Sequence, residues 1–456
     1  MDLSGRMSRR DAITAGASLL TAATLNGTAS ANAAKTLNIA CIGIGGRMDT
    51  LYREAIGGLG QNLVAMCDVD PNQMTAAVRN TGSLLKNAVQ YSDYRKLLAH
   101  EKSIDAVIVA TPDHWHAPIC AAAIRAGKHV YCEKPLAHTV AEARMLRTLS
   151  KRSKVITQTG NQGSASDNMR RCVEVIQRGL VGQIHEVHIW HPTHSWPSGV
   201  DRPAGSDTPP PGMNWDFWLG TSPERPFKAE NYHPALWRGW YDFGSGSLGD
   251  FCCHAFNLPV RALGLNYPHR IEVSGATPGS ESFPAACSLR FHFAGKGKRA
   301  PVVISFYTGG ELPPAEATRD LAATYGSVPG LGCLLIGDKG VISAGLWNSD
   351  GLIKLKGDIG FTGVLDHDGA KKVPKTLPRV ESQMKEWVDA CLGGPAVYSS
   401  FEIGGHITEI GLAGIVALRL GKDIDWDGGA MEALDEPDAE RLVHPQYRKP
   451  WASLIR

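Results

Sequence analysis

Residues 37–48, LNIACIGIGGRM, join a continuously apolar run to a glycine-rich turn. A run without charged residues is typical of a parallel strand that is covered on both faces. Gly43 permits a tight turn, and Gly45 lets backbone N–H groups approach a pyrophosphate at a helix N-terminus. The stretch therefore predicts the first strand and the phosphate-binding turn of a dinucleotide-binding domain.

The residues that follow alternate between strands and helices up to about Thr159. The predicted strands are 37–44, 63–70, 104–112, 129–135 and 155–160, and helices are predicted at 49–57, after Pro71, at 117–127 and at 139–153. Strands joined by helices of this length pair in parallel with right-handed crossovers. We therefore predict a Rossmann-type α/β domain, a doubly wound parallel sheet, over residues 35–160.

A different pattern begins after Gly160. After a helix at 167–179, the strand candidates are 184–191, 269–276, 285–293, 301–308, 333–344 and 352–356. Alternation and glycine turns predict an α+β domain with an open, largely antiparallel sheet over residues 161–430. Further helices are expected at 247–263, interrupted near Pro259, and at 381–392 and 406–420. We expect residues 431–456 to form a tail that packs back on the protein.

The first 34 residues are typical of a twin-arginine export signal. Ser8-Arg9-Arg10-Asp11 precedes an uncharged run at 12–25, and Ala31-Asn32-Ala33 has the form of a cleavage site. The apolar run is too short and too rich in alanine for a membrane span. The sequence predicts export, to the periplasm or otherwise through the twin-arginine pathway, and no membrane span in the mature chain.

Composition and charge exclude several classes of protein. The 456 residues include 47 Lys+Arg and 45 Asp+Glu, which gives a net charge of +2. This balance gives no support to nucleic-acid binding. Ten cysteines in an exported chain invite disulfides. However, Cys41 and Cys67 lie in apolar strand candidates and no C-x-x-C occurs, so we predict reduced core thiols.

The ends of the predicted parallel strands carry the candidate cofactor residues. Asp68 ends the second predicted strand, where a carboxylate accepts from ribose hydroxyls and repels a 2′-phosphate, which favours NAD over NADP. Thr111, Pro112 and His116 follow the next strand, although a histidine at a helix start can serve only local hydrogen bonds. A tight turn in a domain without a nucleotide is the alternative for Gly43 and Gly45.

Two further groups have residues suited to proton transfer. Lys134, in the Glu133-Lys134-Pro135 stretch, ends a predicted strand, where it can hydrogen-bond a substrate hydroxyl. Asp250 and His254 are four residues apart and share one face of a predicted helix, where we expect Asp250 to support His254. A surface ion pair and a satisfied core histidine are the structural alternatives for that pair.

Taken together, these segments resemble one enzyme family. GIGGR (43–47), ATPDHWH (110–116), CEKP (132–135), TGNQG (159–163), WRGWYDFGSGSLGDFCCH (237–254) and YRKPW (447–451) resemble the glucose–fructose oxidoreductase / inositol dehydrogenase / rhizopine-catabolism (Gfo/Idh/MocA) family. The resemblance implies that Lys134, Asp250 and His254 form the catalytic group. Met48 stands where the turn of the family usually has a glycine. The resemblance also implies a homodimer or homotetramer that forms through the open sheet.

The expected site residues follow from these motifs. The expected NAD-binding residues are Gly43, Gly45, Gly46, Arg47, Asp68, Thr111, Pro112, His116, Glu133 and Lys134. The expected substrate-binding residues are Asn161, Trp237, Tyr241, Asp250 and His254. Six tryptophans fall between residues 190 and 240, and we expect one or two to face a sugar ring. His185, His188, His191 and His194 alternate in facing along a strand, so no metal site is expected.

Three functions fit these observations. The leading hypothesis is an exported NAD-dependent oxidoreductase that acts on a secondary alcohol of a carbohydrate or polyol. Because free NAD is scarce outside the cytoplasm, we expect the enzyme to hold NAD(H) tightly and to recycle it internally. The first alternative is an enzyme that cleaves glycosides by oxidation, elimination and reduction, although dedicated glycosidases that resemble this family tend to replace the lysine. The second is a non-catalytic sugar-binding protein on the same fold.

Overall fold

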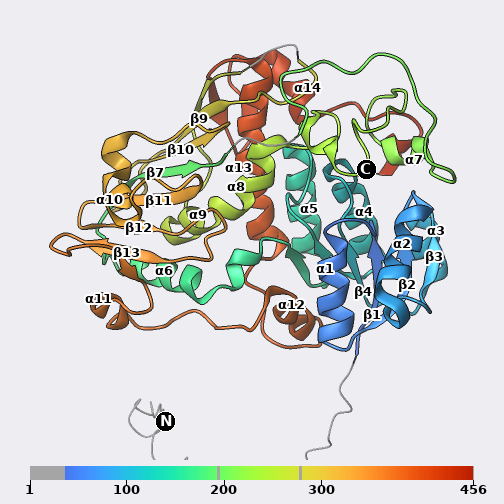
Figure 1. Cartoon of the computed structure of the whole chain (residues 1–456), viewed down its shortest axis with the longest axis horizontal. Helices are drawn as coiled ribbons and strands as arrows, with labels where there is room; N and C mark the ends of the chain where they lie inside the picture. Colours follow the sequence, from blue (N-terminus) through green and yellow to red (C-terminus); the bar gives the residue numbers. More distant parts are fainter. Residues whose placement is uncertain (1–35, 193–195, 277–279, 455–456) are drawn as a thin grey trace, which may run out of the picture. The chain divides into compact units, whose positions relative to one another are not determined.

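The apolar run that opens the chain forms β1 (Asn38–Ile42), an interior strand of a six-stranded parallel sheet. A computed structural model describes residues 36–192, 196–276 and 280–454, so the predicted signal lies outside the described residues. The strand order is β3-β2-β1-β4-β5-β6 (Figure 1). The other strands are β2 (Asn62–Cys67), β3 (Val89–Tyr91), β4 (Ala106–Val109), β5 (His129–Cys132) and β6 (Thr157–Thr159). The doubly wound parallel sheet is confirmed, and its order reverses between β1 and β4, where such sheets bind ligands.

The helices of this sheet are α1 (Met48–Tyr52), a π-helical turn at Arg53–Gly58, α2 (Pro71–Thr81), α3 (Tyr94–His100), α4 (Asp113–Arg125) and α5 (Val140–Arg152). Three of them, α2, α3 and α5, begin at a side-chain cap that the sequence provides. Asp70 accepts a hydrogen bond from the N–H of Asn72 to cap α2, and Thr139 forms a capping box with Glu142 at α5. The sequence prediction missed β3 and α3, because the three-residue edge strand carries little apolar pattern.

A ten-stranded sheet forms the second half of the fold. Its order is β14-β13-β12-β11-β7-β10-β9-β8-β15-β16, and only β7 and β10 pair in parallel. The strands are β7 (Ile184–Trp190), β8 (Arg270–Ser274), β9 (Cys287–Phe293), β10 (Val302–Thr308), β11 (Gly332–Gly337), β12 (Gly340–Ser343), β13 (Leu352–Leu355), β14 (Thr362–Gly363), β15 (Ile424–Asp427) and β16 (Glu432–Ala433). The prediction of an open, largely antiparallel sheet is confirmed.

Helices cover both faces of the second sheet. The core face packs against α6 (Asp167–Gln177), α8 (Gly246–Ala255), α9 (Asn257–Leu263) and α13 (Phe401–Leu420), while α10 (Ala315–Tyr325) packs on the opposite face with Trp190 and Leu334. Short helices lie at α7 (Trp215–Leu219), α11 (Asp368–Lys371) and α14 (Glu440–Val443). The break between α8 and α9 falls at Phe256 and not near Pro259, because a proline in the first turn of α9 lacks only an N–H that has no helical partner.

Two helices near the C-terminus need comment. Helix α13 is long and apolar enough to cross a membrane, but 89% of its most apolar stretch is buried inside the protein, as in a core helix. Helix α12 (Gln383–Cys391) returns to the first sheet, although the sequence placed residues 381–392 in the second domain. Its Trp387 ring lies edge-on to Tyr131 with centroids 5.7 Å apart. This packing is not visible in the sequence, because the apolar face of α12 could cover either sheet equally well.

The thiols and the C-terminal tail have simple surroundings. All ten cysteines are free and nine are buried, which confirms the prediction of reduced core thiols. In the tail, the Trp451 ring packs edge-on to Trp115 with centroids 5.5 Å apart. Arg448 donates a hydrogen bond to Asp216, and Tyr447 donates one to Glu142. The tail therefore contacts both the α4 helix and the tryptophan-rich loop.

Candidate active site

A pocket lies at the carboxyl edge of the parallel sheet, where β1 and β4 end. Gly43 has a φ of +82°, and a Cβ there would lie 2.7 Å from the backbone nitrogen of Thr111. Only glycine tolerates both the backbone angle and this close approach. The pocket wall includes Gly43, Gly45, Gly46, Arg47, Thr111 and Pro112 from the predicted cofactor set. Met48, where a glycine is usual, is fully buried and fills the core beneath α1.

Asp68 faces the same pocket from the end of β2. One of its carboxylate oxygens accepts a hydrogen bond from the N–H of Ile44 at 2.7 Å, and the other accepts from the N–H of Asp70 at 2.9 Å. Burial raises the pKa of Asp68 above its ordinary value, and these two hydrogen bonds only partly oppose that shift. A carboxylate has about four acceptor sites, so Asp68 can still accept from the hydroxyls of a ribose.

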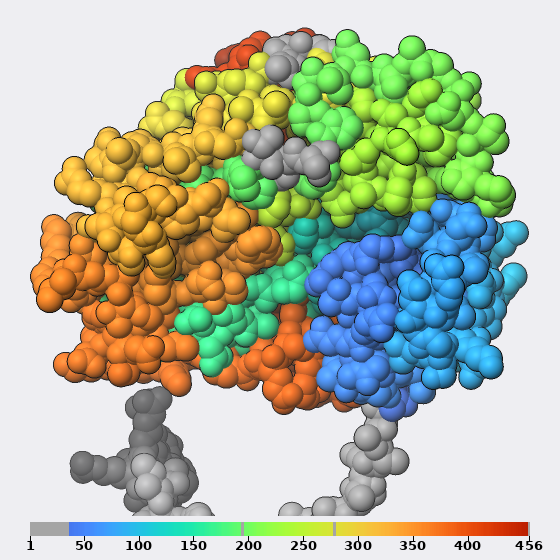
Figure 2. All heavy atoms as spheres, viewed as in Figure 1, coloured from blue at the N-terminus to red at the C-terminus, as the bar shows by residue number. Residues whose placement is uncertain are grey.

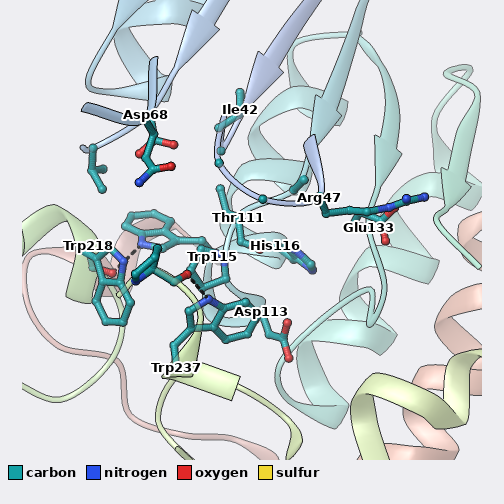
Figure 3. A pocket seen from close by; sticks show the side chains of 18 of the residues that line it. Ile42, Arg47, Asp68, Thr111, Asp113, Trp115, His116, Glu133, Trp218 and Trp237 are labelled. Carbon is teal, nitrogen blue, oxygen red and sulfur yellow. Dashed lines mark hydrogen bonds and ion pairs between the residues drawn. The ribbon is translucent and has the colours of Figure 1, made fainter. Parts of the chain in front are cut away.

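Glu133 organises the opposite side of the pocket, where Figure 3 shows it beside Arg47. Its carboxylate accepts hydrogen bonds from Arg47 Nε and Gln162 Nε2, each at 2.9 Å. A Cβ at Gly160 would lie 2.7 Å from the Glu133 carboxyl carbon. Glu133 therefore holds the β1–α1 turn against the residues that follow β6, which is a positioning role.

Lys134 and Asp250 form a buried ion pair across the two halves of the fold. Lys134 Nζ lies 2.5 Å from Asp250 Oδ1, and both side chains are 17% exposed. Burial alone would lower the pKa of Lys134, but the carboxylates of Asp250 and Glu133 outweigh burial and raise it. Burial alone would raise the pKa of Asp250, but the Lys134 ammonium outweighs burial and lowers it. Both groups are therefore charged at neutral pH.

His254 lies one turn after Asp250 on α8 and is 2% exposed. Burial, followed by the positive charge of Lys134, lowers the pKa of His254 to about 3, so the imidazole is neutral. Its Nδ1 is buried and has no hydrogen-bond partner among the described residues. We predicted that Asp250 supports His254, but the hydrogen bond of Asp250 goes to Lys134 instead. The stronger charge on the ammonium explains this pairing.

Asp113 is a site residue that the sequence analysis did not select. It follows Pro112, lines the pocket and is 4% exposed. Its carboxylate accepts a hydrogen bond from the hydroxyl of Ser245, which directly precedes α8. Burial raises the pKa of Asp113 to about 7, against the hydrogen bond from Ser245 and the charge of Arg238. The available signal was its place at a strand end, directly after the Thr111-Pro112 pair.

Aromatic side chains form the remaining wall. Figure 3 shows Trp115, Trp218 and Trp237 grouped on one side of the pocket. Of the six tryptophans between residues 190 and 240, Trp218 and Trp237 therefore reach it. The loop segment that carries them lies at the surface beside the first strands and helices of the parallel-sheet half (green and blue in Figure 2). Arg238, a further wall residue, lies with its guanidinium carbon 4.3 Å from the centre of the Trp237 ring.

Two histidines at the start of α4 have their ring nitrogens against backbone oxygens. His116 contacts the carbonyl oxygens of Pro135 at 2.6 Å and Thr111 at 2.9 Å, and it also lines the pocket. His114 contacts those of Trp218 and Phe243. Burial lowers the pKa of His116 to about 4 and that of His114 to about 3. Both rings therefore brace the loops around the pocket, as the local alternative proposed.

Three of the five predicted substrate residues do not line this pocket: His254, described above, and Asn161 and Tyr241. The Asn161 side chain is 1% exposed, donates to the carbonyl of Cys253 at 3.4 Å and accepts from Ser399. Tyr241 lines a second cavity, with its ring 4.1 Å from Phe283 between centroids. The structure thus gives Asn161 and Tyr241 packing roles. Within the described residues, no three His, Cys, Asp or Glu side chains gather as a metal site requires.

The pocket has the features that a nicotinamide dinucleotide requires. The glycine turn approaches Thr111 so closely that a side chain at Gly43 would fill the cradle. Asp68 presents acceptor oxygens at the second strand end, and the Lys134–Asp250 pair lies in the wall of the same pocket. Gly43, Gly45, Gly46 and Asp68 would therefore hold the dinucleotide, with the ion pair at its reactive end.

Comparison with known proteins agrees with this geometry. The Gfo/Idh/MocA sequence models match residues 37–161, described as an oxidoreductase family NAD-binding Rossmann fold, and residues 168–286, described as the C-terminal alpha/beta domain of an oxidoreductase family. Together they cover just over half of the chain.

Individual relatives are more distant. The chain is 32% identical over 158 residues to an inositol 2-dehydrogenase of Salmonella paratyphi B, which covers 34% of this chain and 46% of that protein. It is 30% identical over 155 residues to a glycosyl hydrolase family 109 protein of Saccharopolyspora erythraea, which covers 33% of this chain and 34% of that protein. The chain thus matches less than half the length of these curated relatives. The WlbA dehydrogenase of Bordetella pertussis, solved with NADH and UDP-GlcNAcA, has the same fold, with a TM-score of 0.59, 17% identity and coverage of 86% of this chain and 99% of that one.

Proposed function

This chain belongs to the Gfo/Idh/MocA family of NAD-binding oxidoreductases, and on that premise we propose that it oxidises a secondary alcohol of a carbohydrate or polyol. The observation that carries the proposal is the Lys134–Asp250 ion pair of 2.5 Å in the wall of the dinucleotide pocket. An ammonium fixed at that place is a hydrogen-bond donor for the hydroxyl that reacts. The similarity to inositol 2-dehydrogenase supports a polyhydroxylated substrate.

The protonation states assign roles to the three catalytic candidates. When bound, NAD supplies the acceptor for the hydride that leaves the carbinol carbon. Lys134 is already protonated, so it orients the hydroxyl and stabilises the negative charge that develops on its oxygen. Asp250 holds the ammonium in place. Neutral His254, whose Nδ1 has no partner among the described residues, is the proton acceptor we propose. Its lowered pKa makes it a weak base, so the departure of the hydride, which makes the hydroxyl proton strongly acidic, has to drive the transfer.

We further propose that the protein is exported and retains its cofactor through each cycle. The support is the order of two segments: Arg9-Arg10 precedes the Gly43–Gly46 turn in one chain. The twin-arginine route carries folded proteins, so NAD can travel inside. Rapid exchange of bound NAD during turnover, with a requirement for added NAD, would contradict this proposal. A homodimer or homotetramer through the open sheet is part of the same proposal.

Glycoside cleavage is the second candidate function. The similarity to a glycosyl hydrolase family 109 protein favours it, and oxidation followed by elimination would use the same ion pair. In that case the hydride returns to the substrate and no NADH accumulates. The presence of Lys134 supports the oxidoreductase, because it supplies the charge beside the reacting hydroxyl. A non-catalytic sugar-binding protein would have no use for this buried ion pair, which costs desolvation energy.

Two products separate these functions. One sample of purified protein is denatured, and the bound nicotinamide that it releases is quantified. A second sample, kept intact, is incubated with myo-inositol, free aldoses and nitrophenyl glycosides. NADH or an oxidised sugar supports the oxidoreductase, while nitrophenol without net NADH supports glycoside cleavage. Lys134→Met, which keeps an unbranched side chain one atom shorter and removes the charge, should lower turnover by about 10²–10⁴-fold with NAD affinity unchanged. Full activity in this variant would refute the catalytic assignment.

A further inference from the structure

An exposed tryptophan lies beside the catalytic helix, on a loop outside the tryptophan-rich segment. Trp347, between β12 and β13, is 43% exposed, although large aromatic side chains are usually covered. Its ring lies 6.4 Å from His254 and 6.1 Å from Phe251 between centroids. Both neighbours are on α8, so the indole flanks the same helix that presents Asp250 to Lys134.

The backbone around Trp347 is held firmly in place. The next residue, Asn348, is fully buried at a φ of +54°. Its side chain accepts a hydrogen bond from the N–H of Leu258 at 2.9 Å, which ties the loop to the first turn of α9. A non-glycine residue in the left-handed region persists only where its surroundings hold it there. Here the buried amide and the α9 contact supply that restraint.

A second contact fixes the loop from the side of the first sheet. A Cβ at Gly163 would lie 1.8 Å from the carbonyl oxygen of Trp347, so the chain after β6 runs directly against the loop. Ser166 and Asn168 donate hydrogen bonds to the carbonyl of Ser349 at 2.9 and 3.1 Å. Trp347 is therefore presented by a rigid loop, and its exposed ring does not result from a loose segment.

We infer that Trp347 is a sugar-stacking wall of the substrate site and that it is a residue that favours ring substrates over linear ones. An exposed, pre-oriented indole beside the hydrogen-bonding imidazole of His254 matches the two surfaces of a sugar ring. The C–H face of the ring packs on the indole, while a hydroxyl at the ring edge reaches Lys134 and His254. A linear polyol has no such face and gains little from the indole. This inference rests on the proposed function and adds a specificity-determining residue to it.

The test compares ring and linear substrates in matched variants. Trp347→Ala and Trp347→Phe are assayed with myo-inositol, D-glucose and methyl β-D-glucopyranoside, and with the linear polyol D-sorbitol. Tyr325→Ala is the control, because Tyr325 is 53% exposed and lies on α10, across the sheet from α8. NAD affinity and circular dichroism establish that each variant is folded.

We expect Trp347→Ala to raise KM for the ring substrates by about tenfold, while kcat and the constants for the linear polyol change little. Trp347→Phe should restore most of the loss, and Tyr325→Ala should match the parent. If the parent turns over ring substrates but Trp347→Ala retains their KM, the inference is wrong and the proposed function stands. A parent that prefers D-sorbitol also overturns the inference alone. If it neither binds nor turns over any of the four compounds, the proposed function fails and the inference with it.

Discussion

Asp113 predicts an unusual dependence of stability on pH, which Asp113→Asn should remove. The carboxyl group is 4% exposed and accepts one hydrogen bond, from Ser245. No ion pair within the described ranges neutralises it directly. An asparagine has the same shape and can still accept from the Ser245 hydroxyl through its amide oxygen. The substitution therefore removes the ionisable group and keeps the packing.

The magnitude follows from the displaced pKa. Burial raises the pKa of Asp113 from 3.8 to about 7. Each pKa unit corresponds to about 1.4 kcal/mol, so ionisation in the folded state costs about 4 kcal/mol. Between these two pKa values the folded state binds more protons than the unfolded state, so stability falls as pH rises. The stability that protonated Asp113 contributes is fully present below pH 3.8 and is lost by about pH 7.

Urea unfolding of the parent and of Asp113→Asn, at several values between about pH 5 and pH 8.5, measures this effect. The free energy of unfolding of the variant should gain on the parent by about 3 kcal/mol across that range, because about two pKa units of the transition fall within it. The m-value should not change. A difference between the two proteins that stays constant with pH would refute the assigned ionisation. If the parent instead becomes more stable relative to the variant as pH rises, the folded protein stabilises the carboxylate.

Two further predictions concern the cofactor pocket, and a third concerns Glu174, a buried carboxylate on α6. Gly43→Ala should weaken NAD binding by about ten- to a hundredfold in fluorescence titration, since the new Cβ strains a positive φ and meets the backbone of Thr111; unchanged affinity would contradict the proposed cradle. Asp68→Asn should raise the ratio of NADP to NAD affinity by about tenfold, and an unchanged ratio would remove the charge argument. Burial alone would raise the pKa of Glu174, but hydrogen bonds from Arg379 and other donors lower it to about 2. The stability that this group contributes is present above its ordinary pKa of 4.5 and is lost as pH falls toward 2. Glu174→Gln should therefore lower the free energy of unfolding by about 3 kcal/mol at neutral pH and by less in acid, as measured by thermal unfolding.

The local pattern was sufficient for much of the fold. Continuous apolar runs such as residues 37–44 specify buried parallel strands whatever surrounds them, and Asp70 and Thr139 cap their helices through contacts two or three residues away. The edge strand β3 and helix α3 were missed because they carry little apolar periodicity. Helix α12 has a strong helical pattern, but its pattern does not say which of two apolar surfaces it will cover.

In the candidate site too, some residues could be predicted from the local sequence, while others depend on tertiary packing. Gly43, Asp68 and Lys134 were predictable because strand ends in a parallel sheet meet at one edge, so their spacing in the sequence fixes their place. Asn161 and Tyr241 were expected in the pocket on the basis of neighbouring motifs, yet their side chains serve packing contacts. The pairing of Asp250 with Lys134, which are 116 residues apart, depends on how α8 docks.

The sequence by itself determined which segments become strands, which strand ends carry chemistry and which family the chain resembles. These features depend on side-chain periodicity and on contacts between near neighbours. The tertiary structure alone decided that Asp250 holds Lys134, that Asp113 is buried against Ser245 and that the ring of Trp347 lies against α8. Burial raises the pKa of Asp113, while the opposite charges of Lys134 and Asp250 outweigh burial and shift the pKa of each the other way. Both effects result from the packing of distant segments, which no local pattern specifies.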